Sequence, residues 1–233
     1  MLKNLLNLLK KFFFALKARC VYRWWVLPVY ALGYYITFYF LERRVTEESG
    51  FHLIAAPIDY KIPFCEYFII PYNIWFVYIM GTVAFFVLVN KPRKEYYRFE
   101  LTMIIGMSIF LLVSWLYPNG LNLRPSSFAR SNYCTHLVQN LYNRDTPTNV
   151  FPSMHVYNSI CAWLALRECT WMRGKQWLIN LLSVLTLLII ASTLFLKQHS
   201  IYDVLAALIV GYISYQIIYK SRWAARWQDE VVL

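Results

Sequence analysis

Long runs of apolar residues, separated by short polar segments, dominate the pattern along this 233-residue chain. A helix needs roughly 20 such residues to cross a hydrocarbon core of about 30 Å. Six stretches approach this length, at residues 22–41, 67–89, 99–117, 153–167, 177–196 and 200–219. The fourth is the shortest and contains Asn158 and Ser159. The pattern predicts an all-α, integral-membrane bundle of six helices, which forms a single domain over residues 22–220.

The first 21 residues follow a different pattern, because Lys3, Lys10, Lys11 and Lys17 interrupt Leu and Phe at helical spacing. A cleaved signal peptide would need an unbroken apolar core and a cleavage site of small residues. We expect residues 1–21 to form an amphipathic helix on the membrane surface instead. Residues 221–233 are expected to form a short cytoplasmic tail.

The composition supports a membrane protein, since 59% of the residues are hydrophobic and only 15% are charged, against roughly 25% charged residues in soluble domains. The net charge of +11 fits Lys and Arg residues that orient the chain in a membrane. We therefore expect membrane lipids, and not nucleic acid, as partners. The five cysteines show no CxxC spacing, which indicates neither a zinc site nor a disulfide framework.

Counts of Lys and Arg between the six stretches predict the orientation. With a cytoplasmic amino terminus, sixteen of the 23 positive residues fall on the cytoplasmic side. The other seven are Arg43, Arg44, Lys61, Arg124, Arg130, Arg144 and Lys197. We predict that both termini are cytoplasmic. Three polar segments, at 117–136, 150–155 and 197–203, then share the extracytoplasmic side, where their residues can form one site.

The last of these segments contains His199 and Asp203, which are four residues apart and share one face of a helix beginning near Ser200. An aspartate bound to one imidazole nitrogen fixes the tautomer and leaves the other nitrogen free to attack or to accept a proton. Ionisable groups in a membrane helix are costly, which favours a functional pair. The alternative is a structural hydrogen bond that holds the start of the helix.

His155 lies just after Pro152 and Ser153, where a helix is expected to begin with Ser153 as its N-cap. The free N–H groups of such a terminus can bind phosphate. The helix dipole disfavours a charged imidazole there until an anion arrives, a behaviour that suits a general acid. The alternative is a hydrogen-bonding histidine at the membrane interface.

Two cationic residues complete the predicted site. Arg124 precedes Pro125 in a loop with few charges, and Lys197 lies two residues before His199. With the helix start at Ser153, they would form a cationic cradle for a tetrahedral anion. The alternatives are a solvated or lipid-facing arginine and a lysine that extends toward lipid headgroups.

These segments resemble the type 2 phosphatidic acid phosphatase superfamily, whose motifs read K-x6-R-P, P-S-G-H and S-R-x5-H-x3-D. The third motif matches at Ser192, His199 and Asp203, the second at Pro152, Ser153 and His155, and the first at Arg124 and Pro125. The resemblance implies catalytic roles for His155, His199 and Asp203. It also implies phosphate contacts at Arg124, Ser153, Lys197 and Met154, and activity without a metal or another cofactor.

Three positions depart from the family motifs. Tyr117 replaces the lysine of the first motif, Met154 the glycine of the second, and Thr193 the arginine of the third. Two cationic phosphate ligands are therefore missing, and Lys197 or Arg130 is expected to replace them. A similar loss of cations occurs in the sphingolipid synthase branch, where the phosphoryl group passes to a lipid alcohol.

The sequence thus predicts an integral-membrane enzyme whose substrate is a lipid phosphate. The leading hypothesis is a lipid phosphatase that hydrolyses a phosphomonoester or pyrophosphate lipid through a phosphohistidine intermediate. A phospholipid or sphingolipid headgroup transferase with the same residues is the first alternative. A non-catalytic lipid-binding membrane protein is the second.

Overall fold

The computed structural model describes residues 25–45, 50–90 and 92–221. This part of the chain contains seven α-helices: α2 (Val26–Arg44), α3 (Ile69–Ala84), α4 (Arg93–Leu116), α5 (Tyr133–Arg144), α6 (Met154–Glu168), α7 (Gln176–Phe195) and α8 (Ile201–Tyr215). Short 3-10 helices lie at Glu66–Phe68 and Thr170–Met172, and π-helical turns at Phe85–Val89 and Gln216–Lys220. The strands β1 (His52–Leu53) and β2 (Asn119–Gly120) form one short parallel pair.

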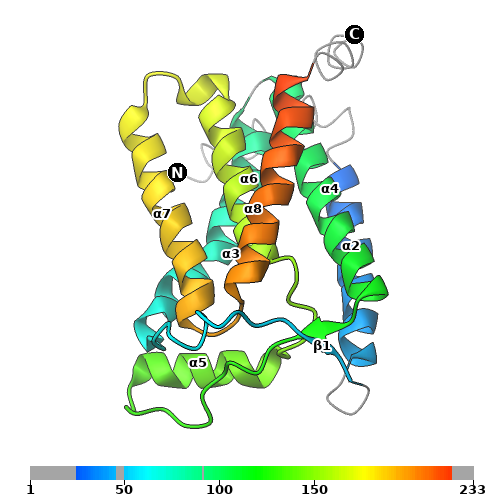
Figure 1. Cartoon of the computed structure of the whole chain (residues 1–233). Coiled ribbons are helices and arrows are strands. Elements are labelled where there is room, and N and C mark those ends of the chain that lie inside the picture. Colours follow the sequence, from blue (N-terminus) through cyan, green and yellow to red (C-terminus); the bar gives the residue numbers. More distant parts are fainter. Residues whose placement is uncertain (1–24, 46–49, 91, 222–233) are drawn as a thin grey trace, which may run out of the picture.

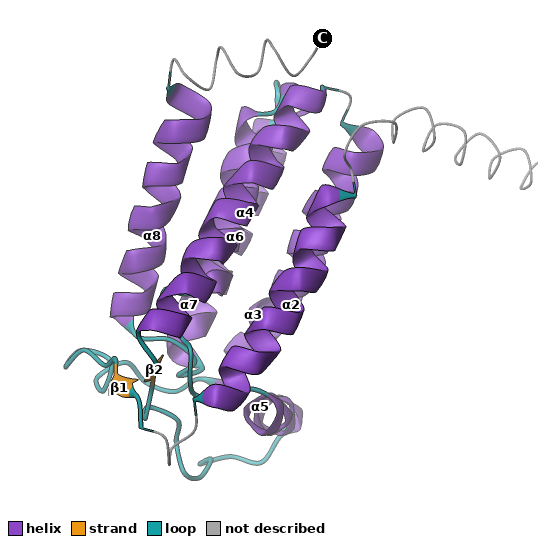
Figure 2. Cartoon of the chain, turned by 90° about the vertical axis from the view of Figure 1, so that its right-hand side faces the viewer, coloured by secondary structure: helices purple, strands orange, loops and turns teal. Residues whose placement is uncertain are grey.

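Six of these helices run side by side, and α5 lies across one end of the bundle (Figures 1 and 2). Helix α6 is central, since it packs against α3, α4, α7 and α8, while α2 packs against α4. The six helices follow the six predicted apolar stretches in order. The helical fold class is therefore confirmed, with the two-residue strands as the exception.

Four helical segments of the described residues are long and apolar enough to cross a membrane: Glu66–Val89, Arg93–Leu116, Gln176–Phe195 and Ile201–Lys220. The chain is accordingly an integral membrane protein. Helix α6, with 15 residues, rises only about 22 Å, less than the hydrocarbon thickness, and α2 ends in Arg43 and Arg44. Six crossings and cytoplasmic termini stay predictions. The expected amphipathic helix at 1–21 lies outside the described residues, as does the tail beyond residue 221.

A close contact between helices in the core joins α4 to α6. The ring of Tyr157 lies directly over Gly106, where an added Cβ would be 1.9 Å from a ring carbon. The Tyr157 hydroxyl donates a hydrogen bond to the Thr102 carbonyl (2.7 Å), and its oxygen can accept one from the Ser214 hydroxyl (3.1 Å). The side chain of Tyr157 therefore joins α6 to both α4 and α8, and only glycine at position 106 leaves room for it.

Helix α5 was not anticipated in the segment between the third and fourth apolar stretches. Asn132 caps it, because its side chain accepts a hydrogen bond from the Thr135 N–H while Thr135 Oγ1 accepts one from the Asn132 N–H. Its apolar face consists of Cys134, Leu137, Val138, Leu141 and Tyr142. This spacing is typical of an amphipathic helix, so the signal for α5 was present in the sequence.

Candidate active site

The candidate site lies where α6 and α8 begin, at the end of the bundle that α5 crosses (Figure 1). The Ser153 N–H donates a hydrogen bond to the Asp203 carbonyl at 3.2 Å, which joins the two helix starts through their main chains. Ser153 Oγ accepts a hydrogen bond from the Val156 N–H at 3.4 Å. The predicted N-cap at Ser153 is therefore confirmed, and this helix start is part of the site.

At the start of α8, the imidazole of His199 lies against the carboxylate of Asp203, with 3.3 Å between Nδ1 and Oδ2. The same Oδ2 atom accepts a hydrogen bond from the Ser200 N–H at 2.8 Å. Asp203 thus contacts His199 and caps the helix at once, so the predicted hydrogen bond at the helix start is present, and the functional role of the pair stays a prediction. The side chain of Asp203 is completely buried, and its Oδ1 atom has no hydrogen-bond partner among the described residues.

The ring of His155 lies 5.7 Å from the ring of His199, measured between centroids. On its other sides His155 packs against two aromatic rings of α3, Tyr72 at 4.6 Å and Trp75 at 4.2 Å. The aromatic packing restricts the orientation of the His155 imidazole. The structure therefore brings the two predicted catalytic histidines together, one from each helix start.

Arg124 approaches this region from the loop after β2. Its guanidinium donates to the Asp145 carbonyl (2.7 Å) and to Gln198 Oε1 (2.9 Å), and it lies over the Tyr142 ring at 4.6 Å. Two buried N–H donors here, Arg124 Nε and Gln198 Nε2, have no acceptor within the described ranges. Buried donors are nearly always paired, so these two are available to a hydrogen-bond acceptor.

Lys197 is buried and makes contacts that the sequence did not suggest. Its Nζ atom donates to the carbonyls of Asp59 (2.6 Å) and Ile62 (2.5 Å) in the loop before α3. An ammonium has three N–H bonds, so one remains for a further acceptor. The backbone of Lys197 has φ of 54°, a left-handed conformation that is unfavourable for a side chain with a Cβ.

Burial determines the charges of the site. It lowers the pKa of His199, so this imidazole is neutral near pH 7 and has a lone pair available. Burial also lowers the pKa of the Arg124 guanidinium, which nevertheless stays protonated. Beside it, burial raises the pKa of Asp145 to about 6, against the opposing effect of Arg124. The site thus combines a neutral imidazole with a fixed positive charge.

The remaining predicted residues have other contacts. Met154 is the first residue of α6 and packs into the core, and the buried Ser192 hydroxyl donates to the Ile189 carbonyl. Tyr117 stacks on His52 with centroids 4.2 Å apart. The guanidinium of Arg130 lies 3.9 Å from Glu66, with its side chain 70% exposed. Neither of these last two contacts involves the histidine pair or its direct partners.

Several residues of the site were missed in the sequence. Gln198 binds Arg124, and Tyr72 and Trp75 surround His155. Asn119 holds the segment that leads to Ser153, since its Oδ1 atom accepts from the N–H groups of Val150 (2.8 Å) and Phe151 (3.0 Å). These contacts join residues far apart in the chain, and no local spacing indicates them.

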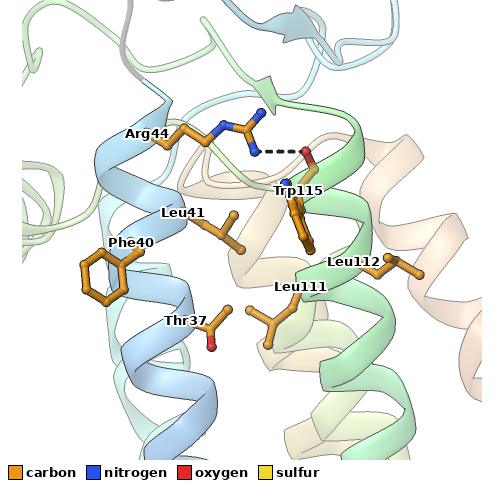
Figure 3. A pocket seen from close by; sticks show the side chains of 7 residues that line it. All are labelled: Thr37, Phe40, Leu41, Arg44, Leu111, Leu112 and Trp115. Carbon is orange, nitrogen blue, oxygen red and sulfur yellow. Dashed lines mark hydrogen bonds between the residues drawn. The ribbon is translucent and has the colours of Figure 1, made fainter.

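Two hollows lie between α2, α4 and the loops that follow them. An apolar groove of about 510 Å³ runs between α2 and α4, with Arg44 and Trp115 at its end, where Arg44 donates to the Trp115 carbonyl (Figure 3). It is lined by Thr37, Phe40, Leu41, Arg44, Leu111, Leu112 and Trp115. A second hollow of about 500 Å³ reaches Arg124 and is lined by Gly50, Phe51, Leu121, Asn122, Arg124 and Pro147.

A histidine–aspartate pair, a second histidine and a half-buried arginine at one end of a membrane helix bundle are typical of an enzyme that acts on phosphate esters. Comparison with protein families matches residues 100–227 to the PAP2 superfamily. This stretch covers more than half of the chain, and the chain belongs to that superfamily. Searches of the curated proteins and of the solved structures with this chain found no match. Membership supports a function of the phosphatase or phosphotransferase type.

Proposed function

We propose that the protein is a membrane lipid phosphatase that hydrolyses a phosphomonoester or pyrophosphate lipid through a phosphohistidine at His199. The observation that carries this proposal is the contact of His199 with Asp203, together with the second histidine beside it. The ring centroids of His199 and His155 are 5.7 Å apart. A nucleophile with an orienting carboxylate and a second proton-transfer group is the arrangement that double displacement requires.

In the first step, the Nε2 lone pair of His199 attacks phosphorus, and a P–N bond forms as the bond to the leaving lipid oxygen breaks. Asp203 accepts a hydrogen bond from the Nδ1–H group of His199 and stabilises the positive charge that develops on the imidazole. His155, protonated when the anionic substrate binds at the start of α6, gives its proton to the leaving oxygen.

In the second step, neutral His155 removes a proton from water, and the resulting hydroxide oxygen attacks phosphorus while the P–N bond breaks. Phosphate leaves, and both histidines return to their starting states. The phosphoryl oxygens would be bound by Arg124, by the N–H group of Met154 at the start of α6, and by the third N–H bond of Lys197. The unpaired donors Arg124 Nε and Gln198 Nε2 support this assignment.

The groove between α2 and α4 supports a lipid as the substrate. The segments that leave these helices form the β1–β2 pair and line the hollow that reaches Arg124. The end of α2 is also attached to the segment before α6, because Asn149 Nδ2 donates to the Leu41 carbonyl at 3.3 Å. A lipid whose acyl or isoprenyl chain lies in the groove would therefore have its phosphate at the end of the bundle that holds the candidate site.

The proposal is tested with a panel of radiolabelled lipid phosphates and pyrophosphates, assayed with purified protein in detergent and a metal chelator. We expect label in free phosphate and an acid-labile phosphoenzyme. If the label enters a second lipid when an alcohol acceptor is added, the protein is a phosphotransferase with the same intermediate, which the missing cations at Tyr117 and Thr193 favour. Turnover that requires a divalent ion would contradict the mechanism.

Arg124→Gln should lower kcat/KM by about 10²–10³-fold, because the phosphoryl oxygens lose a charged donor in a water-poor site. Steady-state rates on the best lipid of the panel measure this. Arg144→Gln is the matched control, since Arg144 is an exposed residue at the end of α5. Equal losses in the two variants would refute a specific role for Arg124.

A Leu112→Trp variant should fill the groove between α2 and α4. We expect KM to rise by about tenfold for a long-chain lipid phosphate, the equivalent of roughly 1.4 kcal/mol of lost binding, and to change little for a short-chain analogue. Leu116→Trp is the control, because Leu116 is 74% exposed and does not line the groove. A rise in KM that does not depend on chain length would exclude the groove as the chain site.

A further inference from the structure

The loop before α3, residues 56–62, contacts the chain on both sides of His199. On one side, Lys197 Nζ donates to the Asp59 and Ile62 carbonyls. On the other side, Ser200 Oγ donates to Asp59 Oδ2 at 2.5 Å, and the Ile201 N–H donates to Asp59 Oδ1 at 2.9 Å. Asp59 is therefore bound on both sides of the histidine, once through its carbonyl and twice through its carboxylate.

The carboxylate of Asp59 also completes the start of α8. The first N–H groups of a helix have no partner within the helix. Here the Ser200 N–H binds Asp203, the Ile201 N–H binds Asp59, and the Tyr202 N–H binds Ser200 Oγ. Asp59 is thus the only member of this set that comes from outside the helix start, and its negative charge interacts favourably with the helix dipole.

Burial and hydrogen bonds within the loop hold Asp59 in place. Asp59 is 1% exposed, and its Oδ2 atom also accepts a hydrogen bond from the Ala56 N–H at 2.7 Å, while its own N–H donates to the Ala56 carbonyl. Every oxygen of Asp59 is therefore occupied. A left-handed residue such as Lys197 persists only where its surroundings hold it, and the two hydrogen bonds of its ammonium to this loop provide that hold.

Resting on the function proposed above, we propose that Asp59 is a positioning residue for the nucleophile. It acts through Lys197, which precedes His199 in the chain, and through Ser200 and Ile201, which follow it. The Nε2 atom of His199 is thereby held in line with the scissile bond. Loss of the Asp59 carboxylate leaves the binding of the substrate by Arg124 unchanged and disturbs the attack, so it affects kcat and not KM.

The test uses the full chain in detergent, with rates expressed per folded molecule and measured well below the unfolding temperature. Asp59→Asn should slow formation of the phosphoenzyme by about 10–100-fold, with KM within about twofold of the original. Asp59→Glu, which keeps the charge, should recover part of the rate. Lys61→Gln is the matched control, because Lys61 is exposed in the same loop, and it should match the original protein.

A purely structural role for Asp59 would lower the unfolding temperature and leave the rate per folded molecule unchanged, and this result would overturn the proposal. Should Asp59→Asn fail to fold, Ser200→Ala keeps the Asp59 carboxylate and removes only the two hydrogen bonds of the Ser200 hydroxyl, to Asp59 and from the Tyr202 N–H, and an unchanged rate in that variant would overturn the proposal equally. If the original protein forms no phosphoenzyme on any lipid tested, the proposed function fails, whereas a normal rate in Asp59→Asn refutes only the positioning role.

Discussion

Replacing His199 with glutamine should reduce phosphate release by about 10⁴-fold or more, the size of loss seen when a covalent nucleophile is removed. Glutamine can still donate a hydrogen bond toward Asp203, but its amide nitrogen has no lone pair able to attack phosphorus. No acid-labile phosphoenzyme should form. Phosphate release from a labelled lipid and trapping of the phosphoenzyme in acid measure the two effects separately.

His136→Gln provides the matched control, since it makes the same substitution at an exposed position on α5. It should keep the original activity and the original amount of phosphoenzyme. A His199→Gln variant that still accumulates labelled enzyme would move the covalent bond to another residue and contradict the proposed mechanism.

Gly106→Ala should produce the largest loss of stability from a single added carbon atom. The new Cβ would lie 1.9 Å from the ring of Tyr157, and this ring cannot move without breaking its hydrogen bonds to Thr102 and Ser214. Overpacking and the lost hydrogen bonds should together cost about 2–4 kcal/mol of the free energy of unfolding. A lower midpoint of thermal unfolding in detergent measures it.

Gly81→Ala is the appropriate comparison, because Gly81 is also in a helix, α3, and nothing lies within 4 Å of a Cβ built there. Its unfolding midpoint should stay the same or rise slightly, since alanine favours helices over glycine. If both variants unfold at the same temperature, the contact between α4 and α6 does not limit the stability of the bundle.

The parts of this molecule that follow from local spacing could be predicted from the sequence. His199 and Asp203 lie four residues apart, and Ser153 stands where a helix cap is expected, so neither prediction needed knowledge of distant contacts. The six apolar stretches gave the helices in order for the same reason. Helix α5 also had a local pattern, the Asn132 cap followed by an amphipathic face, and it could have been found.

The rest depends on contacts between residues far apart in the chain. Asp59 binds Ser200 across 141 positions, and Arg124 binds Gln198 across 74. Nothing in the loop around Asp59 follows a motif, because its carboxylate binds one hydroxyl and two backbone N–H groups, and every residue except proline offers such an N–H group. Lys197 illustrates the limit, since its position beside His199 suggested a phosphate ligand and its ammonium binds two carbonyls of that loop.

The hydrogen bond from the Ser153 N–H to the Asp203 carbonyl joins the two helix starts through main-chain atoms alone. No side-chain replacement removes either atom, short of a proline at position 153. Variants that lack His155 or His199 should therefore keep the two helix starts together and still hold a lipid phosphate that they cannot cleave. Such inactive proteins are the forms in which the natural lipid could be captured from a membrane extract and identified by its mass.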